Sequence, residues 1–66
     1  MTYKLREIRK LRGMTQTELA QAARIHRVTI AKYEAGKCVP SVDRAERLAN
    51  ALGVSLNELI GKEDAS

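Results

Sequence analysis

Apolar residues recur along the chain in five separate segments, at the three- and four-residue spacing typical of amphipathic helices. We predict helices over residues 2–12, 16–23, 27–35, 42–52 and 56–60, and no segment alternates as a β-strand would. The predicted buried positions are Leu5, Ile8, Leu11, Leu19, Ala20, Ala23, Ile30, Tyr33, Ala45, Leu48, Ala49, Leu52, Leu56, Leu59 and Ile60, with Met14, Ile25 and Val54 in the connections. The pattern therefore predicts an all-α fold of five short helices.

Residues that favour helix ends lie at the boundaries of these segments. The glycines that follow amphipathic segments are Gly13, Gly36, Gly53 and Gly61. Glycine adopts the left-handed conformation that commonly ends a helix. Thr15 with Glu18, and Ser55 with Glu58, have the spacing of capping boxes, and Ser41 follows Pro40 as a further cap. Start and stop signals thus agree with the five predicted helices.

The length of the chain, 66 residues, is enough for one small domain. We predict that residues 1–61 form this domain and that residues 62–66 are a disordered tail. The core must be aliphatic because Trp and Phe are absent. Cys38 has no second cysteine to pair with, and no apolar run is long enough for a membrane span or a signal peptide. A cytoplasmic protein is expected.

The charge is unevenly distributed along the chain. The net charge is +4, but residues 1–47 carry 11 Lys and Arg against 5 Asp and Glu, and the remainder carries 1 against 3. A basic surface attracts polyanions such as DNA, RNA or an anionic membrane. Charge alone does not choose among these partners, and a merely solvated surface explains it equally well.

Helices 16–23 and 27–35 are joined by only three residues, Arg24–His26, which fixes a steep angle between them. If Ile30 lies at the centre of the buried face, a rotation of 100° per residue defines the outward face. That face consists of Val28, Ala31, Lys32 and Ala35. Its small alanines keep it slim enough for the major groove of DNA, which is about 12 Å wide. This is the geometry of a helix-turn-helix.

Three residues of helix 27–35 are the candidates for reading bases. Arg27 and Lys32 can donate to guanine, and Val28 can pack on a thymine methyl. Arg27 lies on the flank of the helix, but in its first turn, from which it can reach forward into the groove. A DNA site containing G and T is the resulting hypothesis. The alternative is that Arg27 and Lys32 are ordinary solvated cations.

Other residues are candidates for phosphate contacts, which orient a protein on DNA without reading its sequence. Gln16 opens helix 16–23, where free backbone N–H groups and the helix dipole favour an anion. The further candidates are Lys37 and Thr29 and, more weakly, Lys10, Arg12 and Arg44.

Glu34 falls on the buried side of helix 27–35, and a buried carboxylate needs a partner. Arg9 lies on the inward face of the first helix and offers a bidentate guanidinium. We predict a structural ion pair between Arg9 and Glu34 that holds the first helix against the recognition helix.

Together these residues resemble the lambda-repressor-like helix-turn-helix family, which includes phage repressors, Cro proteins and xenobiotic-response-element type regulators. The resemblance covers residues 4–60 and is carried by Gly13–Gln16 with Glu18–Ala20, Thr29–Ile30, Tyr33–Lys37, Pro40–Ser41 and Leu48–Ser55. It implies a phosphate contact by Gln16, base contacts by Arg27, Val28 and Lys32, and a salt bridge between Arg9 and Glu34.

The sequence departs from the family pattern at four positions. Arg24 replaces a glycine, and a non-glycine residue in the left-handed conformation costs about 1–2 kcal/mol. His26 stands where a Ser or Thr caps the helix, so that cap is weaker or made by an imidazole. Ala35 replaces an asparagine that touches phosphate, and Ala45 replaces a leucine. The turn is therefore predicted to be atypical.

The predicted function is that of a sequence-specific regulator of transcription, a repressor, that binds double-stranded DNA as a homodimer. Leu56, Leu59 and Ile60 cannot all face inward on so short a helix and form the candidate dimer interface, although they could equally cap the core. The alternative function is an antitoxin-like module that sequesters a partner protein.

Neither catalysis nor the binding of a metal or small molecule is predicted. Clustered carboxylates, a metal set and a nucleophile with a base are all missing from the pattern. His26 and Cys38 would supply only two ligands to a metal, so a helix cap and a loop thiol explain them better. We expect no cofactor, metal or small-molecule ligand, and no membrane partner.

Overall fold

The computed structural model describes residues 4–61, which contain five helices and no strand. The helices are α1 (Leu5–Leu11), α2 (Gln16–Ala23), α3 (Arg27–Glu34), α4 (Val42–Leu52) and α5 (Leu56–Ile60). The all-α prediction is confirmed, and the last four helices match their predicted bounds to within one residue. Residues 2–3 of the first predicted helix and the predicted tail 62–66 lie outside the described residues. No described helix is both long and apolar enough to cross a membrane.

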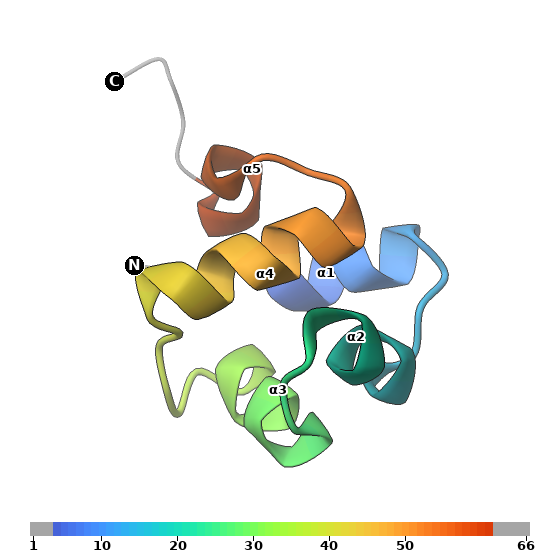
Figure 1. The fold of residues 1–66 in the computed structure, drawn as a ribbon, viewed down its shortest axis with the longest axis vertical. Coiled ribbons are helices and arrows are strands. Elements are labelled where there is room, and N and C mark those ends of the chain that lie inside the picture. The colour runs from blue at the N-terminus through green and yellow to red at the C-terminus, as the bar shows by residue number, and fades with distance from the viewer. Residues whose placement is uncertain (1–3, 62–66) are drawn as a thin grey trace.

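The helices pack around α4, which crosses the middle of the molecule in Figure 1. On one side α4 contacts α5, and on the other it contacts α2, which in turn packs against α3. The first helix, α1, contacts both α3 and α5. The helix-turn-helix pair α2–α3 is thus held from two directions, by α4 and by α1.

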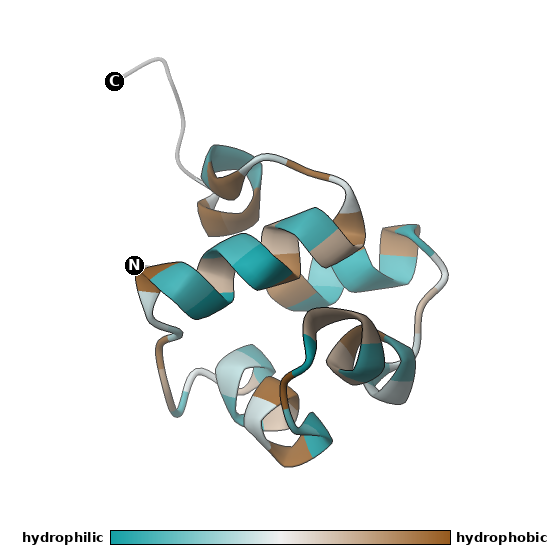
Figure 2. Cartoon of the chain, in the orientation of Figure 1, coloured by the Kyte–Doolittle hydropathy of each residue, from teal (hydrophilic) through white to brown (hydrophobic). Residues whose placement is uncertain are grey.

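Apolar side chains from all five helices form the core, and all of them are aliphatic except Tyr33. The largest of the fully buried ones are Leu5, Leu19, Ile30, Leu48 and Leu59. Figure 2 shows that apolar and polar positions share the helices, as amphipathic segments require. Of the connecting residues predicted to close the core, Ile25 is buried and Met14 and Val54 are partly buried against it.

The prediction that Leu11 belongs to the core is wrong, because 84% of its surface is exposed. At 100° per residue, Arg9 lies about 40° from Leu5 around the helix axis, whereas Leu11 lies about 120° away. Arg9, which is 8% exposed, therefore takes the inward position on α1. The buried ion pair described below lets a charged residue occupy it.

The predicted helix ends are confirmed in detail. At α2 the Glu18 N–H donates to Thr15 Oγ1 at 3.0 Å, and the Glu18 carboxylate accepts from the Thr15 N–H at 2.8 Å. Ser55 and Glu58 form the same reciprocal pair at α5, and Ser41 Oγ accepts from the Arg44 N–H. The four glycines have positive φ angles.

Candidate nucleic-acid interface

The turn between α2 and α3 is tight and contains a left-handed arginine. Arg24 has φ 58° and ψ 45°, the only positive φ of a non-glycine residue in the described chain. The next residue, Ile25, is buried, and its N–H donates to the Ala20 carbonyl at 3.0 Å. Burial of Ile25 anchors the turn, while the left-handed backbone of Arg24 costs about 1–2 kcal/mol relative to glycine.

An imidazole caps α3. His26 Nδ1 accepts a hydrogen bond from the Val28 N–H at 3.3 Å, a longer bond than the 3.0 Å one at the Thr15 cap. Of the two possibilities that the sequence left for this cap, the structure contains the imidazole one. The start of α3 is therefore held less firmly than the start of α2.

The outward face of α3 is the face that the helical rotation predicts. Ile30 is fully buried, whereas Val28 is 45% exposed and Lys32 is exposed. Ala31 is partly buried and Ala35 is exposed, so only small side chains border the cations on this face. Arg27 is exposed in the first turn. The three base-reading candidates thus share one accessible surface at the free side of α3.

A buried network joins α1, α2 and α3 behind that surface. Arg9 Nε and the Glu34 carboxylate are 2.6 Å apart, and a second Arg9 nitrogen donates to the other carboxylate oxygen at 3.2 Å. A third bond, from Arg9 to the Met14 carbonyl, is 2.8 Å long. The two side chains are only 10% and 5% exposed. The structure therefore contains the bidentate ion pair expected from the sequence.

Gln16 is part of the same network. Its Nε2 donates to Glu34 Oε1 at 2.9 Å, which leaves one amide N–H free at the N-terminal end of α2. Burial raises the pKa of the Glu34 carboxyl, but the hydrogen bonds from Arg9 and Gln16 and the nearby positive charges outweigh it and lower the pKa. The charged form of Glu34 thus orients both Arg9 and Gln16.

The remaining phosphate candidates lie on or just after α1, on or after α3, and at the start of α4. Lys10 and Lys37 are exposed at the ends of α1 and α3, and Thr29 is partly exposed. Two of the weaker candidates are engaged elsewhere: Arg12 donates to the Gly53 carbonyl at 3.4 Å and Arg44 to Tyr33 Oη at 3.2 Å. Within residues 4–61 the side chains of Lys10, Lys37 and Thr29 make no hydrogen bond and stay available to a ligand.

Sequence reasoning missed Arg6. This exposed residue lines a shallow pocket with Arg9, Gln16, Glu34 and the small α3 residues Ala31 and Ala35. Its charge contributes to the lowered pKa of Glu34. The three-residue spacing from Arg9, which puts the two side chains on neighbouring parts of α1, was the available signal.

The candidate dimer interface on α5 is only partly accessible. Leu59 is fully buried in the core of the protomer, so its inclusion in an exposed interface is corrected here. Its backbone carbonyl also accepts from the Lys4 N–H at 2.8 Å, which ties α5 to the start of α1. Leu56 and Ile60 are partly exposed and remain the residues available to a second copy.

This fold and this surface define a helix-turn-helix domain, and the chain belongs to the helix-turn-helix family, whose model matches residues 5–59. The chain is 35% identical over 60 residues to the immunity repressor protein of Bacillus phage phi105. The matched region covers 91% of this chain and 42% of the repressor. It is 36% identical over 64 residues to an uncharacterised HTH-type transcriptional regulator of Methanocaldococcus jannaschii, covering 97% of both.

Among solved structures, the restriction-modification controller protein C.AhdI from Aeromonas hydrophila superimposes with a TM-score of 0.83. The sequences are 32% identical, and the match covers 85% of each chain. The resemblance to lambda-repressor-like regulators is thereby confirmed. The chain spans less than half of the phage repressor but nearly all of the archaeal regulator.

Proposed function

We propose that this protein regulates transcription by binding double-stranded DNA, with α3 in the major groove. The observation that carries the proposal is the slim exposed face of α3, held from behind by the buried network of Arg9, Glu34 and Gln16. The proposed activity is binding alone, without a chemical step. It would take place in the cytoplasm, where bacteria and archaea keep their DNA.

The accessible residues of this surface divide into two proposed roles. Arg27, Val28 and Lys32 would contact base edges, because they lie on the accessible face of α3. Contacts to phosphates would come from the N-terminal end of α2 and from the exposed residues that flank α3. These phosphate-binding residues are Gln16, Lys37, Thr29, Lys10 and Arg6.

Selection of duplexes from a random pool, followed by binding measurements on the selected site, tests this function. Alanine at Arg27 or Lys32 should lose about 1–3 kcal/mol of discrimination at one base pair each. Alanine at Lys10 or Lys37 should weaken binding to all duplexes equally and lower the salt dependence. Unchanged base preference in both the Arg27 and Lys32 variants would remove these residues from base reading. No duplex binding even at low salt would favour a protein-binding module instead.

A homodimer is proposed because one recognition helix reads only a few base pairs, and two copies read half-sites about one helical turn apart. The partly exposed Leu56 and Ile60 on α5 are the proposed contact. Sedimentation of the wild type and of Ile60→Asp tests the interface, with Val42→Asp as a control at another exposed apolar position. Equal dimerisation of all three proteins would exclude α5. Repression is the proposed outcome, in analogy to the phage immunity repressor.

A further inference from the structure

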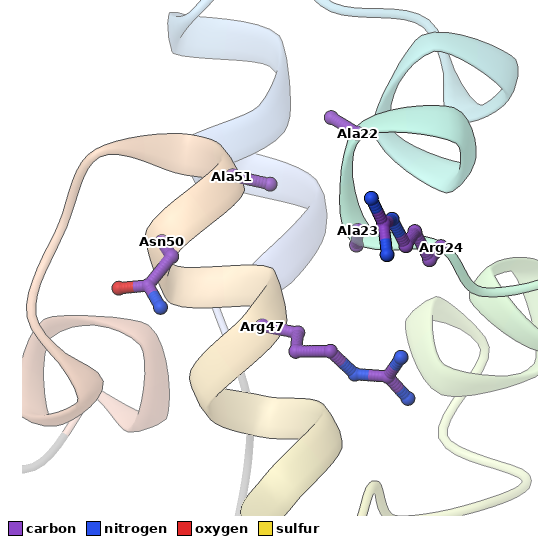
Figure 3. A pocket seen from close by; sticks show the side chains of 6 residues that line it. All are labelled: Ala22, Ala23, Arg24, Arg47, Asn50 and Ala51. Carbon is purple, nitrogen blue, oxygen red and sulfur yellow. The ribbon is translucent and has the colours of Figure 1, made fainter.

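Two arginines from different helices face one shallow pocket beside the helix-turn-helix. The pocket lies between the end of α2 and the C-terminal half of α4, and is lined by Ala22, Ala23, Arg24, Arg47, Asn50 and Ala51. Figure 3 shows that the guanidinium groups of Arg24 and Arg47 extend into this gap from opposite sides. The lining residues include no carboxylate.

Within residues 4–61 these two guanidinium groups have one ion pair between them, a loose contact of Arg47 with the exposed Asp43. No hydrogen bond from the Arg24 side chain occurs there, and the buried Nε atom of Arg47 is also without a hydrogen-bond partner. In that ion pair Asp43 Oδ2 lies 3.6 Å from Arg47 Nε, and the Asp43 side chain is 81% exposed. Such an exposed contact contributes little, so the pocket retains the positive charge of both arginines.

The backbone adds a second unfavourable feature at the same place. Arg24 adopts the left-handed conformation, at φ 58°, that glycine would adopt without strain. Strained residues often occur at ligand-binding sites, and here the strained residue contributes one of two like charges to the same pocket. An anion between the guanidinium groups would offset the repulsion, because guanidinium forks match oxyanions.

The position of the pocket indicates which anion this is. Arg24 precedes Arg27, the first residue of α3, by three positions, and the Arg47 side chain extends from α4 toward α3 (Figure 3). If the first turn of α3 enters the major groove, the sugar–phosphate strand that borders the groove passes close to this end of the helix. Resting on the function proposed above, we propose that Arg24 and Arg47, assisted by Asn50, bind one phosphate of the DNA backbone.

Replacement of Arg24 by glycine provides a sharp test, because it removes the cation and the strain together. The Arg24→Gly variant should melt at a higher temperature than the wild type and yet bind the selected duplex about three- to tenfold more weakly. The slope of log K against log salt concentration should fall by about 0.9, the value for one lost phosphate contact. Arg24→Asn, which also tolerates the left-handed backbone, should reproduce the loss of binding without the added flexibility of glycine.

Arg47→Gln and the double variant test whether the arginines share a phosphate. Arg47→Gln should weaken binding and lower the slope to a similar extent as Arg24→Gly. The fold-loss in affinity of the double variant should be smaller than the product of the two single fold-losses. Both arginines contact the same phosphate, so the second substitution has less left to remove. Lys4→Gln is the matched control, since it removes one charge next to Gly61, on the α5 side, and should leave the slope unchanged.

Three results would overturn the proposal. The first is wild-type affinity and slope in all Arg24 and Arg47 variants. The second is weaker binding with an unchanged slope, which would assign Arg24 to the geometry of the turn. The third is that the Arg24 and Arg47 variants bind an acidic peptide more weakly than the wild type does but bind duplex equally well. That result would assign the pocket to a protein partner. Failure of the wild type to bind any duplex would instead contradict the proposed function itself.

Discussion

The N-terminal ends of α2 and α3, the two helices of the helix-turn-helix, are built very differently. At α2 a reciprocal capping box satisfies the first turn, and the first residue, Gln16, is held by a hydrogen bond to Glu34. At α3 the cap is a single 3.3 Å bond to His26, after a turn in which Arg24 is strained. Both helices are eight residues long, so the difference lies in their ends.

This difference matches the two tasks proposed for the helices. The start of α2 would position the protein on the DNA backbone. The network that ties Gln16 to α1 and α3 holds the Gln16 side chain in place for that contact. The start of α3 would read bases with Arg27 and Val28, and Lys32 would do so from the last turn; both cations are exposed. Rigidity is thus concentrated behind the surface, where Glu34 connects three helices.

The largest expected effect comes from breaking the network at its centre. Glu34→Gln leaves the buried Arg9 without a counter-charge and should lower the free energy of unfolding by about 3 kcal/mol or more. Urea denaturation followed by circular dichroism would measure this loss. Glu46→Gln, on the exposed side of α4, should change the stability by less than about 0.5 kcal/mol. A Glu34→Gln protein as stable as this control would contradict a structural role for the pair.

The contribution of the Glu34 charge should also appear in the pH dependence of stability. The folded-state pKa of Glu34 lies below its ordinary value of 4.5, so its contribution is complete above that value. The contribution is lost as the pH falls from that value through the folded-state pKa, because over this range the unfolded state binds a proton that the folded state does not. The stability gap between the wild type and Glu34→Gln should therefore narrow as the solution is acidified below 4.5. A gap that is constant with pH would show that the charge of Glu34 is not what stabilises the fold.

Removing the cap of α2 should have an intermediate effect. Thr15→Ala leaves the Glu18 N–H without its side-chain acceptor and should destabilise the protein by about 1 kcal/mol. Because the first turn of α2 also orients Gln16, affinity for duplex should fall as well. Thermal melts and duplex titrations would measure the two effects. Thr17→Ala, at a neighbouring exposed position without a capping bond in the described chain, is the control.

Strengthening the cap of α3 should have the smallest effect, and in the opposite direction. His26→Ser replaces the long imidazole bond by a favoured N-cap residue and should stabilise the protein by about 0.5 kcal/mol. A melting temperature lower than that of the wild type would show that the imidazole makes contacts beyond the cap. The two ends of the helix-turn-helix would then be more alike than their hydrogen bonds indicate.

The sequence predicted the helices and their ends well because the interactions that decide them are local. The bonds from Thr15 to Glu18 and from Ser55 to Glu58 span three residues, and their residue types recur at helix starts. At Arg24 the family pattern left a strained or a reshaped turn open, and the structure contains the strained, left-handed one. The Arg9–Glu34 pair was predictable across 25 residues because a buried carboxylate requires a buried cation.

The tertiary structure alone decided which long-range neighbours each side chain meets. Leu11 follows the apolar spacing of α1 but lies exposed, because the ion pair lets Arg9 take the inward position. Gln16 is tied to Glu34, Arg6 lines the pocket beside Ala35, and Arg47 meets Arg24 across the gap between α2 and α4. Helix periodicity specifies the face of one helix, but the rotation and crossing of packed helices depend on all their side chains at once. The helix-turn-helix could therefore be predicted from the sequence. The network that supports the start of α2 and the charged pocket beside the α2–α3 turn were decided by packing.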